Sequence, residues 1–212
     1  MTHLDLLTSL SGKKITAKPE GWYGDKSIGV VTIGDLQAGE NILEVRLPFG
    51  KRTNVEWYFL LGDFGMQMFG EQRVMVPLQN FLGFDDITRQ GLAHYGGNVT
   101  YQIPLETKGG AVTVQVPHYA GAAVKAKLGA QEAYIVYAPY KATFRDVPAG
   151  EHRLELTLLG HRHNSFGPVH LADEKNLWIG PDAWRSVGES WTESYRLKPM
   201  GITSAPRITE SN

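Results

Sequence analysis

The sequence of 212 residues contains no cysteine. This absence excludes disulfide bonds, zinc sites built from thiolates and cysteine nucleophiles, and it leaves the redox compartment and the localisation open. The sequence also has no apolar run of the roughly 20 residues that span a bilayer. Its first residues, MTHLDLLTSLSGKK, lack the basic and apolar regions of a secretory signal. We therefore expect no membrane partner.

An excess of charge of either sign is also missing. There are 21 basic and 22 acidic residues, spread throughout the chain, which gives a formal net charge of −1. No basic stripe is present to neutralise phosphates, so we expect no nucleic-acid partner. Hydrophobic residues make up 42% and charged residues 20% of the chain. This composition and length are typical of a globular protein with a substantial core.

Helical periodicity is scarce, and alternation of apolar and polar residues takes its place. Such alternation predicts strands with one buried face, and it occurs at 43–47, 55–61, 99–103, 112–116 and 154–158. Only two stretches favour short helical turns. They are His3–Leu10, where leucines recur every three residues, and DDITRQGL at 85–92.

Most of the 24 glycines and 11 prolines lie in the breaks between these runs. This pattern is typical of many short antiparallel strands. We predict an all-β fold, an antiparallel β-sandwich of jelly-roll type with a few short helical turns. An immunoglobulin-like sandwich of about 100 residues would require two copies. Because no repeat of that period is visible, we expect one domain over residues 1–212.

The run GHRHNSFGPVH at 160–170 carries the densest group of polar side chains. On a strand, His161 and His163 would project to one face, and His170 or Asp173 could complete a zinc site. A second interpretation is a loop that contacts sugar. The third, which the Phe-Gly-Pro ending favours, is a structural corner in which Asn164 and its neighbour bond the local backbone.

Catalysis has little support in the sequence. Glycoside hydrolysis needs two carboxyl groups about 5 to 10 Å apart, and no pair stands out among the candidate acids. Asp85 and Asp86 precede Ile-Thr as the cap of a helical turn does. GDFGMQMFG at 62–70 lacks the companions of a kinase motif and predicts a strand that ends in a turn. We therefore predict no catalytic residue.

Tryptophans next to the polar loop suggest a binding site instead. A sugar ring stacks on a flat aromatic side chain, and its hydroxyl groups bond polar side chains. The predicted carbohydrate site consists of Arg162, His163, Asn164, His170, Trp178 and Trp184, with either tryptophan as the stacking platform. Burial in the core is the competing interpretation for each tryptophan. We predict no cofactor and no metal in this site. A structural calcium ion bound by Asp25, Asp35 or Asp173 stays open, because no ligand-like spacing stands out.

Residues 95–170 resemble the galactose-binding-like sandwich domains attached to bacterial glycoside hydrolases, both of family 2 and of the rhamnosidase-like type. The resemblance rests on the segments YGGN at 95–98, VPHYAGAAVKAKLG at 116–129, YAPY at 137–140 and AGEHRLELTLLG at 149–160, with NVEWYFLLGDFG at 54–65 and WIGPDAWR at 178–185 as companions. It covers most of the chain and is more specific for the domain type than for activity.

The resemblance implies a non-catalytic carbohydrate-binding or accessory domain, a fragment of a larger multidomain protein. Its partners would be an oligo- or polysaccharide and the catalytic domain of a parent glycoside hydrolase. Two alternatives are a stand-alone glycoside hydrolase on a β-sandwich scaffold and a purely structural domain that braces a catalytic domain. A fold alone does not choose between them.

Overall fold

The structure is a computed structural model, and it describes residues 6–17, 19–51, 57–173, 175, 179–184 and 187–211. It divides into two compact units, Met1–Leu60 and Leu61–Asn212, which are described one at a time. One domain over residues 1–212 stays a prediction. Within the described ranges, no helix has the length and apolar character that crossing a membrane requires.

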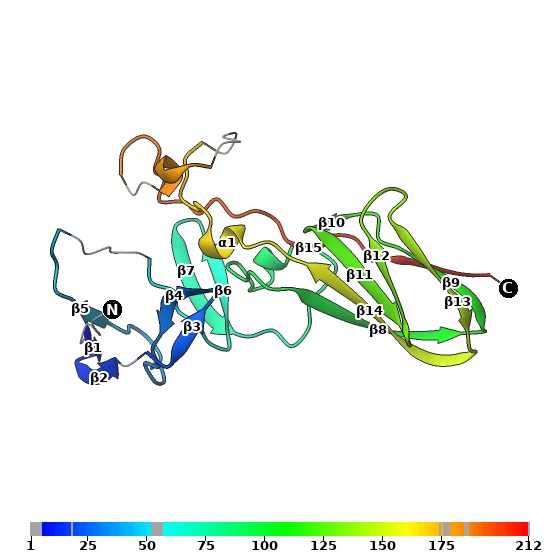
Figure 1. The fold of residues 1–212 in the computed structure, drawn as a ribbon, viewed down its shortest axis with the longest axis horizontal. Coiled ribbons are helices and arrows are strands. Elements are labelled where there is room, and N and C mark those ends of the chain that lie inside the picture. The colour runs from blue at the N-terminus through cyan, green and yellow to red at the C-terminus, as the bar shows by residue number, and fades with distance from the viewer. Residues whose placement is uncertain are drawn as a thin grey trace. The chain divides into compact units, whose positions relative to one another are not determined.

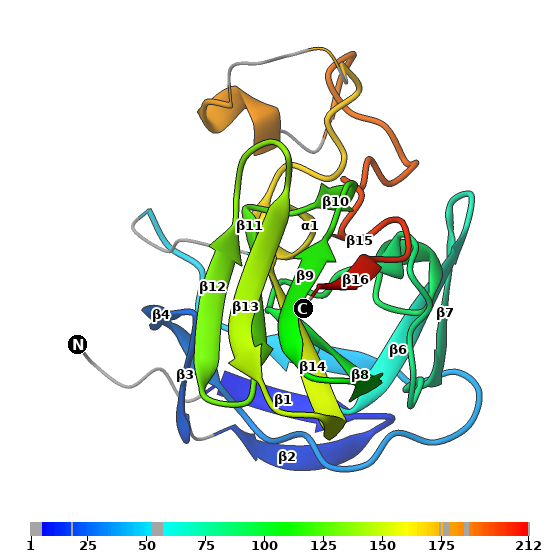
Figure 2. The same cartoon turned by 90° about the vertical axis from the view of Figure 1, so that its right-hand side faces the viewer.

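The second unit contains two antiparallel sheets. The first has the strand order β12-β11-β14-β8 and consists of β8 (Val99–Thr107), β11 (Ala123–Leu128), β12 (Gln131–Ile135) and β14 (Gly150–Leu159). The second has the order β13-β9-β16 and consists of β9 (Gly110–Gln115), β13 (Lys141–Val147) and β16 (Arg207–Ser211). Figure 2 shows β12, β13, β9 and β16 side by side across one face of this unit.

The hydrophobic core lies between these sheets and follows the alternation of the sequence. Leu154, Leu156 and Leu158 of β14 are fully buried, as are Val112 and Val114 of β9. Burying each such side chain stabilises the fold by about 1.5–3 kcal/mol. The core also includes residues of the other strands: Tyr101, Val124, Ala126, Leu128, Ile135, Ala142 and Phe144.

These sheets confirm the predicted all-β fold, an antiparallel sandwich with few helical turns. They also confirm the strands expected at 99–103, 112–116 and 154–158. The jelly-roll and galactose-binding-like assignments are more specific and stay predictions.

Shorter elements complete the second unit. They are the hairpin of β6 (Phe64–Phe69) and β7 (Gln72–Pro77), the paired strands β10 (Tyr119–Ala120) and β15 (Gly201–Ile202), and the short helices η1 (Ile87–Arg89), α1 (His163–Phe166) and η2 (Pro181–Trp184). The strand and turn predicted at 62–70 and the helical turn predicted at 85–92 are both confirmed.

The first unit contains a sheet with the strand order β2-β1-β5 and a separate hairpin. The sheet consists of β1 (Leu6–Leu10), β2 (Lys13–Ala17) and β5 (Leu43–Arg46), and the hairpin of β3 (Gly21–Tyr23) and β4 (Asp25–Val30). Figure 1 marks these strands in blue. The strand expected at 43–47 is therefore present.

Two sequence predictions in this region are wrong. The helical turn expected over His3–Leu10 is the strand β1 from Leu6 onward, and residues 3–5 lie outside the described residues. Ser11 and Gly12 have positive φ angles of 47° and 82°, which allow a tight turn into β2, and β5 pairs with the other edge of β1. The alternation at 55–61 forms no strand over the described residues 57–61, and residues 55 and 56 lie outside the described residues.

Candidate functional site

The polar run at 160–170 begins where β14 ends and its pairing with the two adjacent strands stops. β14 pairs with β11 up to Leu159 and with β8 up to Leu158. At Gly160 a Cβ atom would overlap the carbonyl oxygen of Gly97, so only glycine allows the chain to leave the sheet here. The zinc interpretation required His161 and His163 to lie on one strand; residues 160–162 are not in a strand and His163 begins α1, so the structure does not supply that geometry.

Asn164 binds a distant part of the backbone. Its amide nitrogen donates to the carbonyl oxygen of Lys198, and its amide oxygen accepts from the backbone N–H of Lys198, both at 2.8 Å. The side chain is only 2% exposed. Ser165 Oγ donates to the carbonyl oxygen of His94 at 2.7 Å. These contacts differ from the local turn expected for Asn164 and Ser165, because the corner joins segments that are far apart in sequence.

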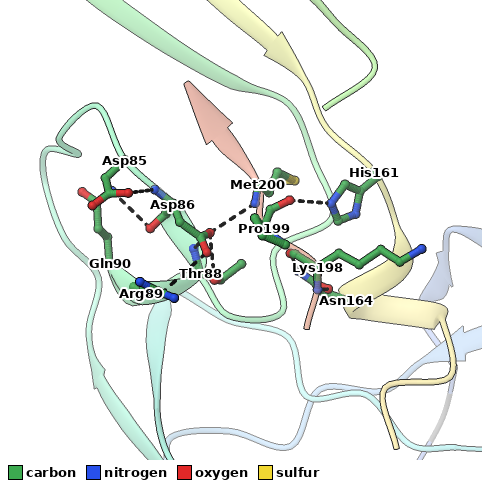
Figure 3. Close-up of polar contacts among 10 residues, drawn as sticks. All are labelled: Asp85, Asp86, Thr88, Arg89, Gln90, His161, Asn164, Lys198, Pro199 and Met200. Atoms are coloured by element: carbon green, nitrogen blue, oxygen red, sulfur yellow. Dashed lines mark hydrogen bonds and ion pairs between the residues drawn. The ribbon is translucent and has the colours of Figure 1, made fainter. Parts of the chain in front are cut away.

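Residues 198–200 pass between this corner and η1, as Figure 3 shows. On one side, His161 Nε2 donates to the carbonyl oxygen of Pro199 at 3.1 Å. On the other side, the Met200 N–H donates to Asp86 at 3.2 Å, and its carbonyl oxygen accepts from the Ile87 N–H at 2.7 Å. The segment is therefore fixed on both sides by polar contacts.

Asp86 is the N-cap of η1, as the sequence suggested. Its Oδ1 accepts from the backbone N–H of Thr88 at 3.0 Å and from the Thr88 hydroxyl at 2.8 Å. Asp85 accepts the backbone N–H of Asp86 at 2.7 Å. Both carboxylates of the adjacent pair therefore bind the local backbone.

His163 is half-buried at the start of α1, and its surroundings disfavour the charged form. Burial lowers its pKa most, and electrostatic repulsion from Lys198 and then His161 lowers the pKa further. A hydrogen bond with the backbone of Arg196 opposes this shift. The neutral imidazole that results can both donate and accept a hydrogen bond.

His170 belongs to a packed aromatic cluster. It is 8% exposed, and its Nδ1 lies 2.9 Å from the carbonyl oxygen of Thr192. Its ring stacks on Trp191 with a centroid distance of 4.2 Å, and it lies 4.3 Å from the ring of Tyr195. The guanidinium of Arg73, which is on β7, lies 5.2 Å from the centroid of the Tyr195 ring, a cation–π arrangement. Sequence reasoning missed Arg73 and Tyr195, since no local pattern marks either residue.

Trp184 and Arg162 are the accessible members of the predicted site. The Trp184 side chain in η2 is 39% exposed, and its indole N–H donates to the carbonyl oxygen of Phe166 in α1 at 3.4 Å. Arg162 is exposed immediately before α1. Trp178 lies outside the described residues. The structure thus brings Arg162, His163 and Trp184 to one loop region. Asn164 and His170 are buried, and their polar atoms are engaged with backbone groups of Lys198 and Thr192.

Among the residues that the structure describes, no group of three or more His, Asp or Glu side chains is close enough together to hold a metal ion. Asp25, one of the calcium candidates, accepts from the backbone N–H and the hydroxyl of Ser27. These hydrogen bonds lower its pKa. Asp173 accepts the backbone N–H of Lys175 at 3.0 Å.

No protein-family model and no curated protein matches the chain. Among solved structures, a GH2 β-galacturonidase from Eisenbergiella tayi bound to galacturonate is similar at 16% identity with a TM-score of 0.38, over 70% of this chain and 23% of that one. A rhamnosidase from Novosphingobium sp. PP1Y is similar at 14% identity with a TM-score of 0.41, over 96% of this chain and 20% of that one. The chain thus spans about a fifth of the length of these structures. At such identities and TM-scores, the likeness assigns neither a family nor a function to this chain.

Proposed function

We propose that the chain is a non-catalytic accessory domain of a larger glycoside hydrolase and that it binds carbohydrate at the corner around α1. The observation that carries the proposal is the hydrogen bond between the Trp184 indole and Phe166. It ties an exposed aromatic ring to the loop that presents Arg162. Sugar recognition requires this combination of an apolar stacking surface and polar groups for hydroxyls.

The six predicted residues divide into two roles. Arg162 and Trp184 contact the sugar, and the neutral imidazole of His163 adds a hydrogen bond. Asn164 and His170 are positioning residues, because their polar atoms already bind the backbone of Lys198 and Thr192. The parent hydrolase is proposed from the sequence resemblance, and Trp178 remains part of the proposal on the sequence alone.

A structural role in bracing a catalytic domain is the second candidate. The observation that favours it is the β6–β7 hairpin, which exposes Phe69, Val74 and Met75, followed by exposed Leu78 and Phe81. Phe69 and Val74 lie on one side of this hairpin, and exposed apolar side chains that gather on one side mark contact surfaces. The stand-alone hydrolase has less support, because Asp85 and Asp86 hold the backbone around η1.

A glycan array followed by titration of the best ligand tests the proposal. We expect Trp184→Ala to weaken binding by about 1–3 kcal/mol, since it removes the stacking surface. Arg162→Ala is expected to weaken the same ligand. The matched control is Trp22→Ala, which removes another exposed tryptophan, on β3. Binding that survives Trp184→Ala, or falls equally in the control, contradicts this site, and an array without any ligand favours the bracing role.

A further inference from the structure

The two outer faces of the sandwich differ in charge. On the four-stranded sheet, the outward side chains include both signs, and they pair. Lys125 lies 3.3 Å from Glu132, and Lys127 lies 4.0 Å from Glu155. The register explains these contacts, because Lys127 is directly opposite Glu155, and Lys125 is diagonal to Glu132, two positions along β12 from its direct partner Tyr134. This face is therefore close to neutral.

The three-stranded sheet presents a different face. Val112, Val114, Ala142 and Phe144 point into the core, so the residues that alternate with them point outward. The register sets them in rows across β13, β9 and β16: Lys141, Gln115 and Arg207 in one row, and Thr143, Thr113 and Thr209 in the next. Figure 2 looks onto these three strands.

This face collects positive charge from distant parts of the sequence. Lys141, Arg145 and Arg207 are exposed, and none of them forms an ion pair with any residue that the structure describes. Two acids border the far end: Asp146, at the bulge beside Arg145, and Glu210 on β16, whose carboxylate accepts from the backbone N–H of Lys108 at 3.1 Å. With strands about 4.8 Å apart, Lys141 and Arg207 stand about 10 Å from each other. This separation is about one Debye length at 0.1 M salt, so both cations can attract the same ligand.

Hydroxyl groups lie directly beside these cations. The hydroxyls of Thr113 and Thr143 are 2.9 Å apart, and Thr209 pairs with Thr113 from the other side. A hydroxyl both donates and accepts hydrogen bonds, so the row matches the hydroxyl groups of a sugar chain. The cations of the neighbouring row match carboxylates.

We propose that the outer face of the β13-β9-β16 sheet binds an acidic polysaccharide, with Lys141 and Arg207 on its carboxylates and the threonine row on its hydroxyls. The proposal rests on the carbohydrate-binding function above and adds a ligand class and a second surface. A nucleic acid fits this face less well. Three cations are fewer than the 6–10 phosphate contacts of a typical binder, and the two rows offer no aromatic ring for base stacking.

The test uses the full chain and alginate, a carboxylated polysaccharide, with carboxyl-esterified alginate as the matched neutral ligand. We expect binding of alginate only, with an affinity that falls as salt rises, since binding releases counterions. Lys141→Gln combined with Arg207→Gln is expected to lower the affinity at least about tenfold and to flatten the salt dependence. Thr113→Val with Thr143→Val is expected to weaken binding without changing the salt dependence.

The control is Lys127→Gln combined with Arg153→Gln, which removes two cations from the four-stranded face and changes net charge equally. It is expected to bind alginate within about twofold of the unchanged chain, and melting temperatures confirm that all variants fold. Equal losses in the two double variants, no alginate binding, or tighter binding of single-stranded DNA each overturn the proposal. Neutral glycans that bind through Trp184 while alginate does not leave the proposed function standing and reject this inference alone.

Discussion

Asn164 and Lys198, 34 positions apart, are joined by two hydrogen bonds of 2.8 Å that run in opposite directions between one side-chain amide and one backbone residue. The amide thereby takes the place that a neighbouring strand would occupy. Because Asn164 is buried, water cannot replace either bond when the side chain is removed.

We expect Asn164→Ala to destabilise the second unit by about 2–4 kcal/mol, from two lost hydrogen bonds and two unsatisfied backbone groups. Urea unfolding measures the change. Gln102→Ala is the control, since Gln102 is an amide on the exposed side of β8, and it should cost less than about 0.5 kcal/mol. Equal, small effects of both changes would show that the corner does not depend on this amide.

The cap at η1 gives a second stability prediction. Asp86→Ala removes an acceptor shared by Thr88 and the Met200 N–H, and we expect a loss of about 1–3 kcal/mol. Arg89→Ala is the matched control. Its ion pair with Asp86 is 4.0 Å long and the Arg89 side chain is 84% exposed, so the pair should contribute below about 1 kcal/mol. A larger loss for Arg89→Ala than for Asp86→Ala would contradict the capping role.

His163 predicts how stability depends on pH. Burial, Lys198 and His161 lower its pKa below the ordinary value of 6.5. The unfolded chain therefore binds a proton more readily than the folded chain as pH falls below about 6.5. The contribution of His163 is complete above that pH and is lost as pH falls toward the lowered pKa. We expect the difference in unfolding free energy between pH 8 and pH 5 to shrink in His163→Gln, and an unchanged difference would exclude His163 as a source.

The two units lead to a prediction about fragments. Every hydrophobic residue that the structure describes as buried lies between Ile87 and Ile202, and no residue at 9–15, 19–51 or 57–60 is buried. We expect fragment 61–212 to unfold cooperatively in urea, and fragment 1–60 to show no such transition. If fragment 61–212 instead fails to fold, the result supports one domain over residues 1–212.

The sandwich was predictable where alternation coincides with burial on one side. Leu154, Leu156 and Leu158 occur at every second position of β14, and this period of two predicts which face of the strand points into the core. The region before Leu61 was less predictable, because β3, β4 and β5 bury no side chain and the pairing of its strands depends on turns. The leucines of 4–10 fit a helical turn as well as a strand, and the positive φ angles at Ser11 and Gly12 decide for the hairpin.

The candidate site was predictable in composition and not in arrangement. The polar run at 160–170 marked the corner, and its residues do meet a tryptophan, Trp184. The partners of Asn164, Ser165 and His170 come from other segments of the chain. A local pattern cannot reveal such pairings, since loops approach one another only after the sheets have formed.

The position of β16 in its sheet has a consequence for synthesis. β9 and β13 are complete well before β16 leaves the ribosome, yet β16 is the strand that covers the second edge of β9. Until then the nascent chain exposes an unpaired edge of alternating valine and threonine, a template for pairing with other chains. The interval between making β14 and making β16 is therefore the period in which a newly made chain is most exposed to aggregation.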